Sequence, residues 1–211
     1  MIFEHARELE GNILAENRED DPLWFKDLLP KYETKSEFMA FQAKLRLNNY
    51  LDQTKTAIKN KKGLQKSIFQ AVIKEFKSSL KSNGGPSTYF KRNAMVDARL
   101  CDEYGWFTCE GMYNQDQCSS NHKINPYSTK ESRALFGQWN LDHVIERGRV
   151  IVPALMYAIS QCPRGREVNV QYFYRLLFTH DNLKLVHIAC HDKRAHNRQV
   201  DAAQLFRDRQ Q

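Results

Sequence analysis

Two histidine-bearing segments, well separated along the chain, constrain this protein more than any other feature of its sequence. The first is Trp139-Asn140-Leu141-Asp142-His143, and the second runs from Asp181-Asn182 through a short apolar stretch to Cys190-His191. Short apolar stretches bounded by polar residues are typical of strands. Taken together, the two segments have the spacing of one compact metal-dependent site. A nuclease is the working hypothesis.

The bulk composition is that of a globular protein with a basic character. The chain has 211 residues, of which 41% are hydrophobic and 27% are charged, which is enough for one substantial core or a core with a helical arm. No apolar run approaches the ~20 residues that span a bilayer, and no charged-then-apolar leader opens the sequence. We therefore expect an intracellular protein without a membrane partner. The net charge of +7 favours a polyanionic partner, but only weakly by itself.

Hydrophobic periodicity and capping signals predict an N-terminal helical arm over residues 1–82. Four helices are expected: over residues 3–17, from the N-cap Asp21-Pro22, from the capping box Thr34-Lys35-Ser36-Glu37, and over residues 63–82. The arm is predicted to be part of the same catalytic domain as the region that follows it.

The helix that begins at the capping box should be long, with Phe38, Phe41 and Leu45 on its apolar side. Beyond it, residues 53–74 include several lysines and no acidic residue. Two interpretations stay open for this stretch. It is either a solvated helical surface or an arm whose lysines contact the DNA backbone without distinguishing base sequence.

Asn83-Gly84-Gly85-Pro86-Ser87 is the strongest internal boundary in the sequence. A mixed α and β core over residues 88–198 is expected after it, and then a polar tail, 199–211, that should fray. The elements expected in this part are a helix over 130–136, a strand over 138–144, helices over 151–160 and 170–178, a strand over 183–189 and a final helix from Cys190.

The spacing of cysteine and histidine residues predicts a structural zinc site. Four residues form the candidate ligand set: Cys109, Cys118, His122 and Cys190. Three thiolates and one imidazole suit tetrahedral zinc and leave no position for a substrate. The competing interpretation is a group of buried free cysteines. His187 is the rival for the fourth ligand, and Cys101 and Cys162 have no place in the pattern.

The acid and the histidines of the two opening segments fit the hydrolysis of a phosphodiester. This reaction needs a base that deprotonates water and a cation that stabilises the phosphate and the leaving 3′ oxygen. His143 is the candidate base, because a histidine of ordinary pKa is largely neutral at neutral pH. Asp142 and His191 would hold Mg²⁺. Lys193 would neutralise developing charge and His196 would bind phosphate or the leaving group. A basic helix end is the competing interpretation of these last two.

Three segments together resemble the HNH, or ββα-metal, nuclease motif: Asp142-His143-Val144-Ile145, Asn182-Leu183-Lys184-Leu185 and Cys190-His191-Asp192-Lys193. A closer resemblance, to the caspase-activated DNase family, rests on residues 118–127, 133–143 and 178–191. It continues more weakly back to residues 17–25 and so covers most of the chain. This family supplies the nuclease subunit of the DNA fragmentation factor, which cuts chromatin between nucleosomes in apoptosis.

The resemblance implies an α+β fold, in which a ββα-metal core with a structural zinc is elaborated by inserted helices and an N-terminal helical arm. It implies a Mg²⁺-dependent endonuclease that cuts double-stranded DNA and leaves 5′-phosphate ends. The same zinc ligands, magnesium ligands and base follow from it, with Lys193 and His196 assisting. Asn182 would brace the segment that carries His143. Lys35 and Lys193 would contact DNA.

The family also implies partners and a location. Its members carry an N-terminal CIDE domain that binds an inhibitor-chaperone, they form homodimers, and they occur in the nucleus and the cytoplasm. We expect the CIDE domain to be absent from this chain, which leaves its inhibitor and its dimer open. Asp192 and Arg194 depart from the lysine and threonine expected there. The alternative function is a non-catalytic, zinc-stabilised DNA-binding module, and an RNA-cutting enzyme is a weaker third.

Overall fold

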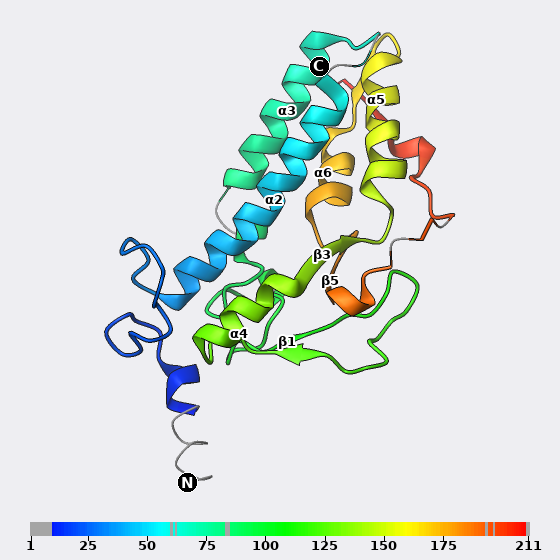
Figure 1. Cartoon of the computed structure of the whole chain (residues 1–211). Coiled ribbons are helices and arrows are strands. Elements are labelled where there is room, and N and C mark those ends of the chain that lie inside the picture. Colours follow the sequence, from blue (N-terminus) through cyan, green and yellow to red (C-terminus); the bar gives the residue numbers. More distant parts are fainter. Residues whose placement is uncertain are drawn as a thin grey trace.

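A helix of 25 residues, α2 (Lys35–Lys59), forms the axis of the fold (Figure 1). The computed structural model describes residues 10–59, 61, 63–82, 85–192, 194–195 and 197–209. α2 begins at the predicted capping box. The amide of Glu37 donates to Thr34 Oγ1 (3.1 Å), and the amide of Thr34 donates to Glu37 Oε2 (3.1 Å). These reciprocal bonds satisfy backbone donors that the first turn leaves free.

The buried face of α2 differs in part from the expected one. Phe38 is buried as predicted, but Phe41 and Leu45 are exposed, and Met39 and Leu47 occupy inward positions instead. Apolar residues occur on two neighbouring sides of this helix. The packing of the other elements therefore decides which side is buried, and the periodicity alone does not.

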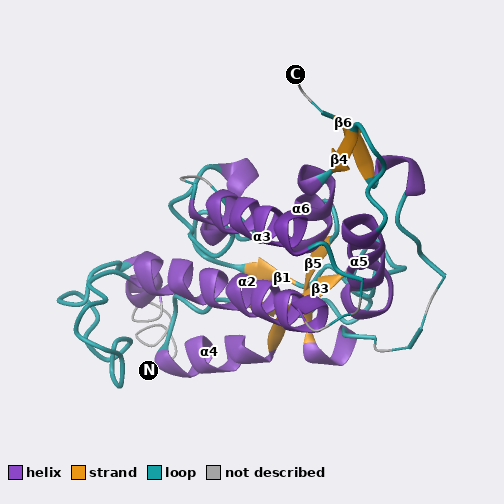
Figure 2. Cartoon of the chain, turned by 90° about the horizontal axis from the view of Figure 1, so that it is seen from above, coloured by secondary structure: helices purple, strands orange, loops and turns teal. Residues whose placement is uncertain are grey.

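Three more helices lie around α2 (Figures 1 and 2). α3 (Lys66–Lys81) runs back beside it, α6 (Val170–Phe178) packs against both α2 and α3, and α5 (Val152–Ser160) packs against α2. The three predicted helices over these ranges are confirmed. A shorter helix, α4 (Lys130–Leu135), begins at its N-cap Thr129 and leads through a 3-10 turn into the next strand.

The sheets are small and antiparallel. The predicted strands are confirmed as β3 (Trp139–His143) and β5 (Leu183–His187), which pair so that His143 lies opposite Leu183. Two further pairs have strands of two or three residues, too short to show a periodicity. They are β1 (Phe107–Thr108) with β2 (Lys123–Ile124), and β4 (Arg166–Val168) with β6 (Phe206–Asp208). The fold is therefore a mixed arrangement of helices and small sheets.

Residues from both sides of the predicted boundary at 83–87 share one hydrophobic core. Trp24 donates from its indole nitrogen to the carbonyl of Pro126 (2.8 Å), and Tyr50 donates to the carbonyl of Leu141. Burial of large aromatic side chains supplies most of the free energy in such a core. The N-terminal arm thus packs directly against the strand that ends at His143.

Two N-terminal predictions need correction. Residues 22–27 form successive turns, not a helix. Asp21 Oδ1 accepts from the amide of Trp24 (3.2 Å) as a cap would, but Asp27 has a left-handed backbone (φ 69°) that stops helical propagation. Of the helix expected over 3–17, residues 10–14 are helical, and residues 3–9 lie outside the described part of the chain.

The C-terminal predictions also need correction. Ile188–Cys190 form one 3-10 turn, and the described residues that follow it, 191–192, 194–195 and 197–201, are not helical. His191 has an extended backbone (φ −79°, ψ 96°), which directs it away from the turn that holds Cys190. The tail does not fray throughout, because β6 pairs with β4 and Leu205 is buried. No described helix has the length and apolar character needed to cross a membrane.

Candidate functional site

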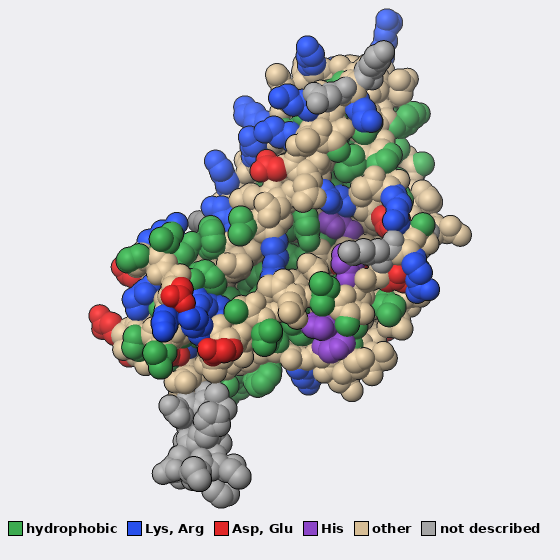
Figure 3. Space-filling model, in the orientation of Figure 1, with side chains coloured by type: hydrophobic (Ala, Val, Ile, Leu, Met, Phe, Trp, Pro, Cys, Tyr) green, Lys and Arg blue, Asp and Glu red, His purple; other side chains and the backbone are tan. Residues whose placement is uncertain are grey.

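A cleft of about 450 Å³ opens where β3 ends. The predicted residues Asp142, His143 and His191 all line it. Asp142 and His143 come from β3, and His191 comes from the segment just after β5. Histidine side chains gather on the same face of the molecule as β3 and β5 (Figure 3). The structure therefore brings the predicted base and the predicted magnesium ligands together.

His143 is held with one defined ring nitrogen facing the protein. It is only 9% exposed, and its Nε2 lies 3.0 Å from the carbonyl oxygen of Leu177. A carbonyl can only accept, so Nε2 carries the proton and Nδ1 keeps its lone pair. Burial lowers the pKa of His143 to about 3. The ring is therefore neutral, and Nδ1 can accept a proton.

Tyr50 fixes the position of this histidine from α2. Its ring meets the ring of His143 edge-on, with centroids 5.0 Å apart, and its hydroxyl donates to the carbonyl of Leu141 (2.5 Å). Burial raises the pKa of Tyr50 to about 12, so the hydroxyl stays protonated. No pattern in the sequence connects Tyr50 to His143, because the two residues belong to different elements far apart in the chain.

Asp142 and His191 form a pair that could hold a divalent cation. Asp142 Oδ1 and His191 Nε2 are 3.3 Å apart. Neighbouring ligands of an octahedral Mg²⁺, with bonds near 2.1 Å, are about 3.0 Å apart. The oxygen of a carboxylate and the nitrogen of a neutral imidazole thus have nearly the separation that the predicted ion requires. The adjacent Asp192 forms hydrogen bonds with Arg194, which offsets part of the extra negative charge.

Asn182 links the loop after β3 to the C-terminal part of α6. It is 1% exposed, and its Oδ1 accepts from the amide of Ile145 (2.7 Å). Its Nδ2 donates to the carbonyls of Ile145 (3.1 Å) and Leu176 (2.8 Å). Ile145 lies two residues after His143. The contacts are those of a residue that fixes the loop following β3.

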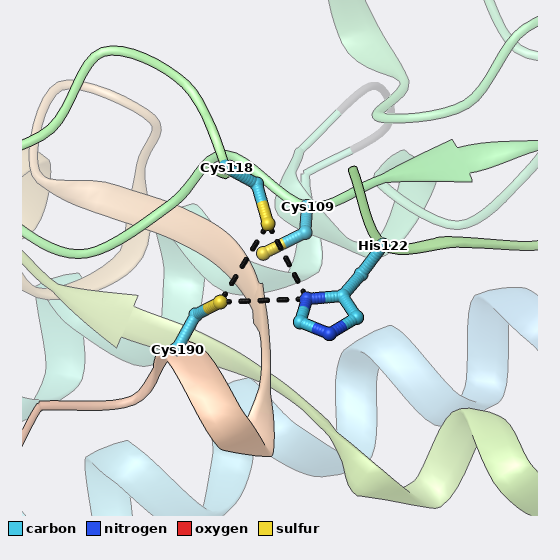
Figure 4. A group of neighbouring side chains, drawn as sticks. All are labelled: Cys109, Cys118, His122 and Cys190. Atoms are coloured by element: carbon cyan, nitrogen blue, oxygen red, sulfur yellow. Dashed lines mark hydrogen bonds between the residues drawn. The ribbon is translucent and has the colours of Figure 1, made fainter. Parts of the chain in front are cut away.

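The four predicted zinc ligands, Cys109, Cys118, His122 and Cys190, form one cluster (Figure 4). Their ligand atoms all lie within 4.8 Å of one another. Cys109 follows β1 and His122 precedes β2, and the amide of Cys109 donates to the carbonyl of His122 (2.9 Å). Cys190 arrives from the turn after β5. Gly111 has φ 75°, and a Cβ there would lie 2.6 Å from the carbonyl oxygen of Gln117, so this loop requires glycine.

The spacing of these atoms fits a tetrahedral metal. The Sγ atoms of Cys118 and Cys190 are 3.6 Å apart, and they lie 3.3 Å and 3.4 Å from His122 Nδ1. Tetrahedral zinc with ordinary bond lengths would separate two sulfurs by about 3.8 Å and a sulfur from a nitrogen by about 3.6 Å. The cluster could therefore bind a metal such as zinc.

The rival ligand, His187, has a different role. Its ring packs on His122 with centroids 4.4 Å apart, and its Nδ1 accepts from the amide of Ala189 (3.3 Å). Cys101 and Cys162 also lie outside the cluster, as predicted. His187 thus packs against the ring of His122 and lies outside the four-residue cluster.

Lys35 does not have the position that a DNA contact needs. Its side chain is 0% exposed, and Nζ donates to Asp21 Oδ2 (2.8 Å) and to the carbonyls of Asn12 (2.6 Å) and Tyr127 (2.8 Å). All three donors of the ammonium are therefore used inside the protein. Burial lowers the pKa of Lys35, while the hydrogen bond that Lys35 donates to Asp21 opposes that shift. The predicted DNA contact is wrong, and Lys35 instead anchors the start of α2. Lys193 and His196 lie outside the described residues.

A second concave surface lies between α2 and α3. This groove has a volume of about 640 Å³, and Phe69, Gln70, Ile73 and Ser78 form part of its lining. The rest of the lining is five lysines: Lys55, Lys59, Lys74, Lys77 and Lys81. Within the described part of the chain none of these lysines forms an ion pair. Basic side chains gather along the α2 and α3 side of the molecule (Figure 3). The lysines of both helices thus form one basic surface, which we call the lysine groove.

Comparison with known proteins identifies the family of this chain. The chain matches the sequence profile of the DNA fragmentation factor 40 kDa family over residues 1–207, and it belongs to this family.

Individual relatives agree with this assignment. The chain is 43% identical over 207 residues to DNA fragmentation factor subunit beta of Rattus norvegicus, covering 98% of this chain and 58% of the relative. The subunit of Homo sapiens is 41% identical over 207 residues, with 98% and 61% covered. A crystal structure of caspase-activated DNase superposes with a TM-score of 0.85 at 40% identity, over 94% of this chain and 80% of that one. The family resemblance seen in the sequence is confirmed. The chain spans less than two thirds of the length of these subunit beta relatives.

Proposed function

We propose that this chain is the nuclease part of a DNA-cutting enzyme, a Mg²⁺-dependent endonuclease that hydrolyses phosphodiester bonds of double-stranded DNA. One observation carries the proposal. Asp142 and His191 offer an oxygen and a nitrogen 3.3 Å apart in the cleft that His143 also lines. The printed names of the relatives, DNA fragmentation factor subunit beta and caspase-activated DNase, support it.

His143 is the proposed general base. Its Nδ1 takes a proton from the attacking water, while the hydrogen bond from Nε2 to Leu177 holds the ring and favours the positive charge that it gains. Tyr50 packs against the ring and limits its rotation. Asn182 keeps the loop after β3 in place through its bonds to Ile145. Each of these contacts reduces the reorganisation needed when the water attacks.

Asp142 and His191 would hold the magnesium ion. When bound, the ion would supply positive charge near the phosphate and the departing 3′ oxygen. The water oxygen forms a bond to phosphorus, the bond from phosphorus to the 3′ oxygen breaks, and that oxygen receives a proton. The products are a 5′-phosphate and a 3′-hydroxyl. We keep Lys193 as a stabiliser of the developing charge and a DNA contact, and His196 as a group for phosphate or the leaving oxygen. Both remain proposals from the sequence.

The fold and the biological setting are proposed in the same terms. β3, β5 and the turn Ile188–Cys190 would be the counterpart of a ββα-metal motif, and the Cys₃His cluster would be its structural zinc site. Relatives with the name DNA fragmentation factor suggest apoptotic cleavage between nucleosomes. An inhibitor-chaperone, a homodimer and a location in nucleus and cytoplasm are proposed for the full-length protein.

A plasmid assay tests the enzyme. Supercoiled plasmid is incubated with the wild type, with His143→Ala and with His180→Ala, each with and without Mg²⁺. Omitting Mg²⁺, in preference to adding a strong chelator, leaves a structural zinc in place. We expect linear products only with Mg²⁺, a loss of about 10²-fold or more in His143→Ala, and wild-type cleavage by His180→Ala, whose side chain is exposed and outside the cleft.

The same assay separates the competing functions. If the wild type with Mg²⁺ cuts no faster than His143→Ala, the enzyme proposal fails. DNA binding without any cleavage would then favour the zinc-stabilised binding module, for which the lysine groove provides a surface. Faster cleavage of a matched RNA than of duplex DNA would favour an RNA-cutting enzyme.

A further inference from the structure

The charges that line the cleft are not evenly paired. Its carboxylates are Asp142, Glu146 and Asp192, and its guanidinium groups are Arg147 and Arg149. Arg149 forms an ion pair with Glu146. Arg147 has no carboxylate partner among the described residues. Of the two arginines in the cleft, Arg149 therefore has a carboxylate partner and Arg147 does not.

Arg147 is nevertheless held in a defined orientation. Its guanidinium lies over the ring of Tyr50, 5.4 Å from the centroid, and its Nη2 donates to the amide oxygen of Gln53. Tyr50 and Gln53 lie three residues apart on α2, so they present one face of that helix to the arginine. Both partners are neutral. They orient the group without neutralising it, and several N–H donors of the guanidinium stay available.

The local backbone adds to the positive potential at this place. Arg147 opens a π-type turn, Arg147–Ile151, that continues directly into α5. The amides of Val150 and Ile151 make the first helical bonds, both to the carbonyl of Glu146 (3.0 Å and 3.1 Å). The N-terminal end of the combined helix therefore lies in the cleft beside Arg147, and helix N-terminal ends favour anions.

We propose that Arg147 is a substrate-binding residue that holds a backbone phosphate of the DNA next to the bond that is cut. This inference rests on the proposed function and adds a residue to it. A planar guanidinium can donate two parallel hydrogen bonds to one phosphate, which fixes the strand as well as attracting it. Because Tyr50 also packs on His143, the platform that orients the arginine is the one that positions the base.

A structural role for Arg147 is the competing interpretation, since its side chain packs on Tyr50. Arg147→Met keeps a long side chain for that packing and removes the charge and the donors. Arg147→Lys keeps the charge and removes the planar fork. Arg149→Met is the matched control, because it removes a neighbouring arginine of the same cleft that already has a carboxylate partner. Circular dichroism and thermal unfolding show whether each variant folds.

Two measurements on these variants test the proposal. The affinity for a short synthetic DNA duplex is measured by fluorescence anisotropy without Mg²⁺ over a series of salt concentrations, and cleavage is measured with Mg²⁺. We expect Arg147→Met to bind about 10-fold more weakly or worse, with the slope of log K against log salt reduced by about 0.9, the value for one phosphate contact. Arg147→Lys should recover the salt slope but not the full affinity. Arg149→Met should change both quantities much less.

The outcomes are separable from those of the plasmid assay. A folded Arg147→Met protein with the wild-type affinity and salt slope would refute the phosphate contact, even if the wild type cuts DNA. A wild type that binds DNA through Arg147 but does not cut would leave the phosphate contact standing and remove the enzyme proposal. If Arg147→Met does not fold, the affinity and cleavage rate of Arg147→Lys decide the question alone. Wild-type values for that variant would count against a bidentate contact.

Discussion

Replacing Asn182 by alanine should destabilise the protein strongly. The side chain makes one hydrogen bond as acceptor and two as donor, all to backbone groups, and it is 1% exposed. Alanine leaves the amide and carbonyl of Ile145 and the carbonyl of Leu176 without these partners. A buried group that loses its partner costs about 1–3 kcal/mol. Because Ile145 is partly exposed, some of this is recovered by water, and we expect a total of about 3–5 kcal/mol.

Urea unfolding followed by tryptophan fluorescence measures this loss. The wild type and Asn182→Ala are compared at equal zinc concentration, with Asn93→Ala as the control, since Asn93 is exposed and outside the cleft. The control should stay within about 0.5 kcal/mol of the wild type. In conditions where Asn182→Ala is still folded, cleavage should slow while DNA affinity without Mg²⁺ stays near the wild-type value. A loss below about 1 kcal/mol, or an unchanged cleavage rate, would contradict the bracing role.

Three further predictions concern pH, zinc and the lysine groove. Burial lowers the pKa of His143 from 6.5 to about 3, so between these values the unfolded chain binds a proton that the folded chain does not. Stability is highest well above pH 6.5 and falls as the pH drops toward 3. Between pH 6.5 and 5 the free energy of unfolding should fall by about 1.6 kcal/mol more in the wild type than in His143→Asn. Equal pH dependence in urea titrations of the two proteins would contradict this. Metal analysis should find about one zinc per chain. Cys118→Ser should lose both the zinc and cooperative unfolding, whereas Cys162→Ser, outside the cluster, should keep both. A zinc-free, stably folded Cys118→Ser protein would exclude a structural metal. A triple variant of the lysine groove, Lys74→Gln with Lys77→Gln and Lys81→Gln, should lower the slope of log K against log salt for DNA binding by up to about 2.7. The control is a triple glutamine variant of the exposed Lys26, Lys44 and Lys123. Equal slopes for the two variants would show that the groove is only a solvated surface.

The parts of the fold that the sequence predicted well are those with a local signal. The capping box at Thr34 and Glu37 is a four-residue pattern, and α2 begins there. The pair β3 and β5 was visible as two short apolar stretches. The Cys₃His cluster was visible because cysteine and histidine are rare enough for their spacing to be informative. In each case the physical cause lies within a few residues of the feature it produces.

The parts that the sequence did not predict depend on distant contacts. Lys35 has the sequence context of a surface residue at a helix start, yet Asp21 and the carbonyl of Tyr127 draw it inside. Tyr50 and Arg147 meet in the cleft because α2 packs across β3, which no short pattern encodes. The final helix was expected from Cys190 onward, but Cys190 and His191 face two different sites and the backbone is extended between them. Tertiary contacts override local preference at these positions.

Cys190 and His191 are neighbours in the chain, but one belongs to the Cys₃His cluster and the other to the cleft. A single peptide bond thus joins the Cys₃His cluster to the open cleft. Any change that moves Cys190 within the cluster would therefore also shift the imidazole of His191 relative to Asp142.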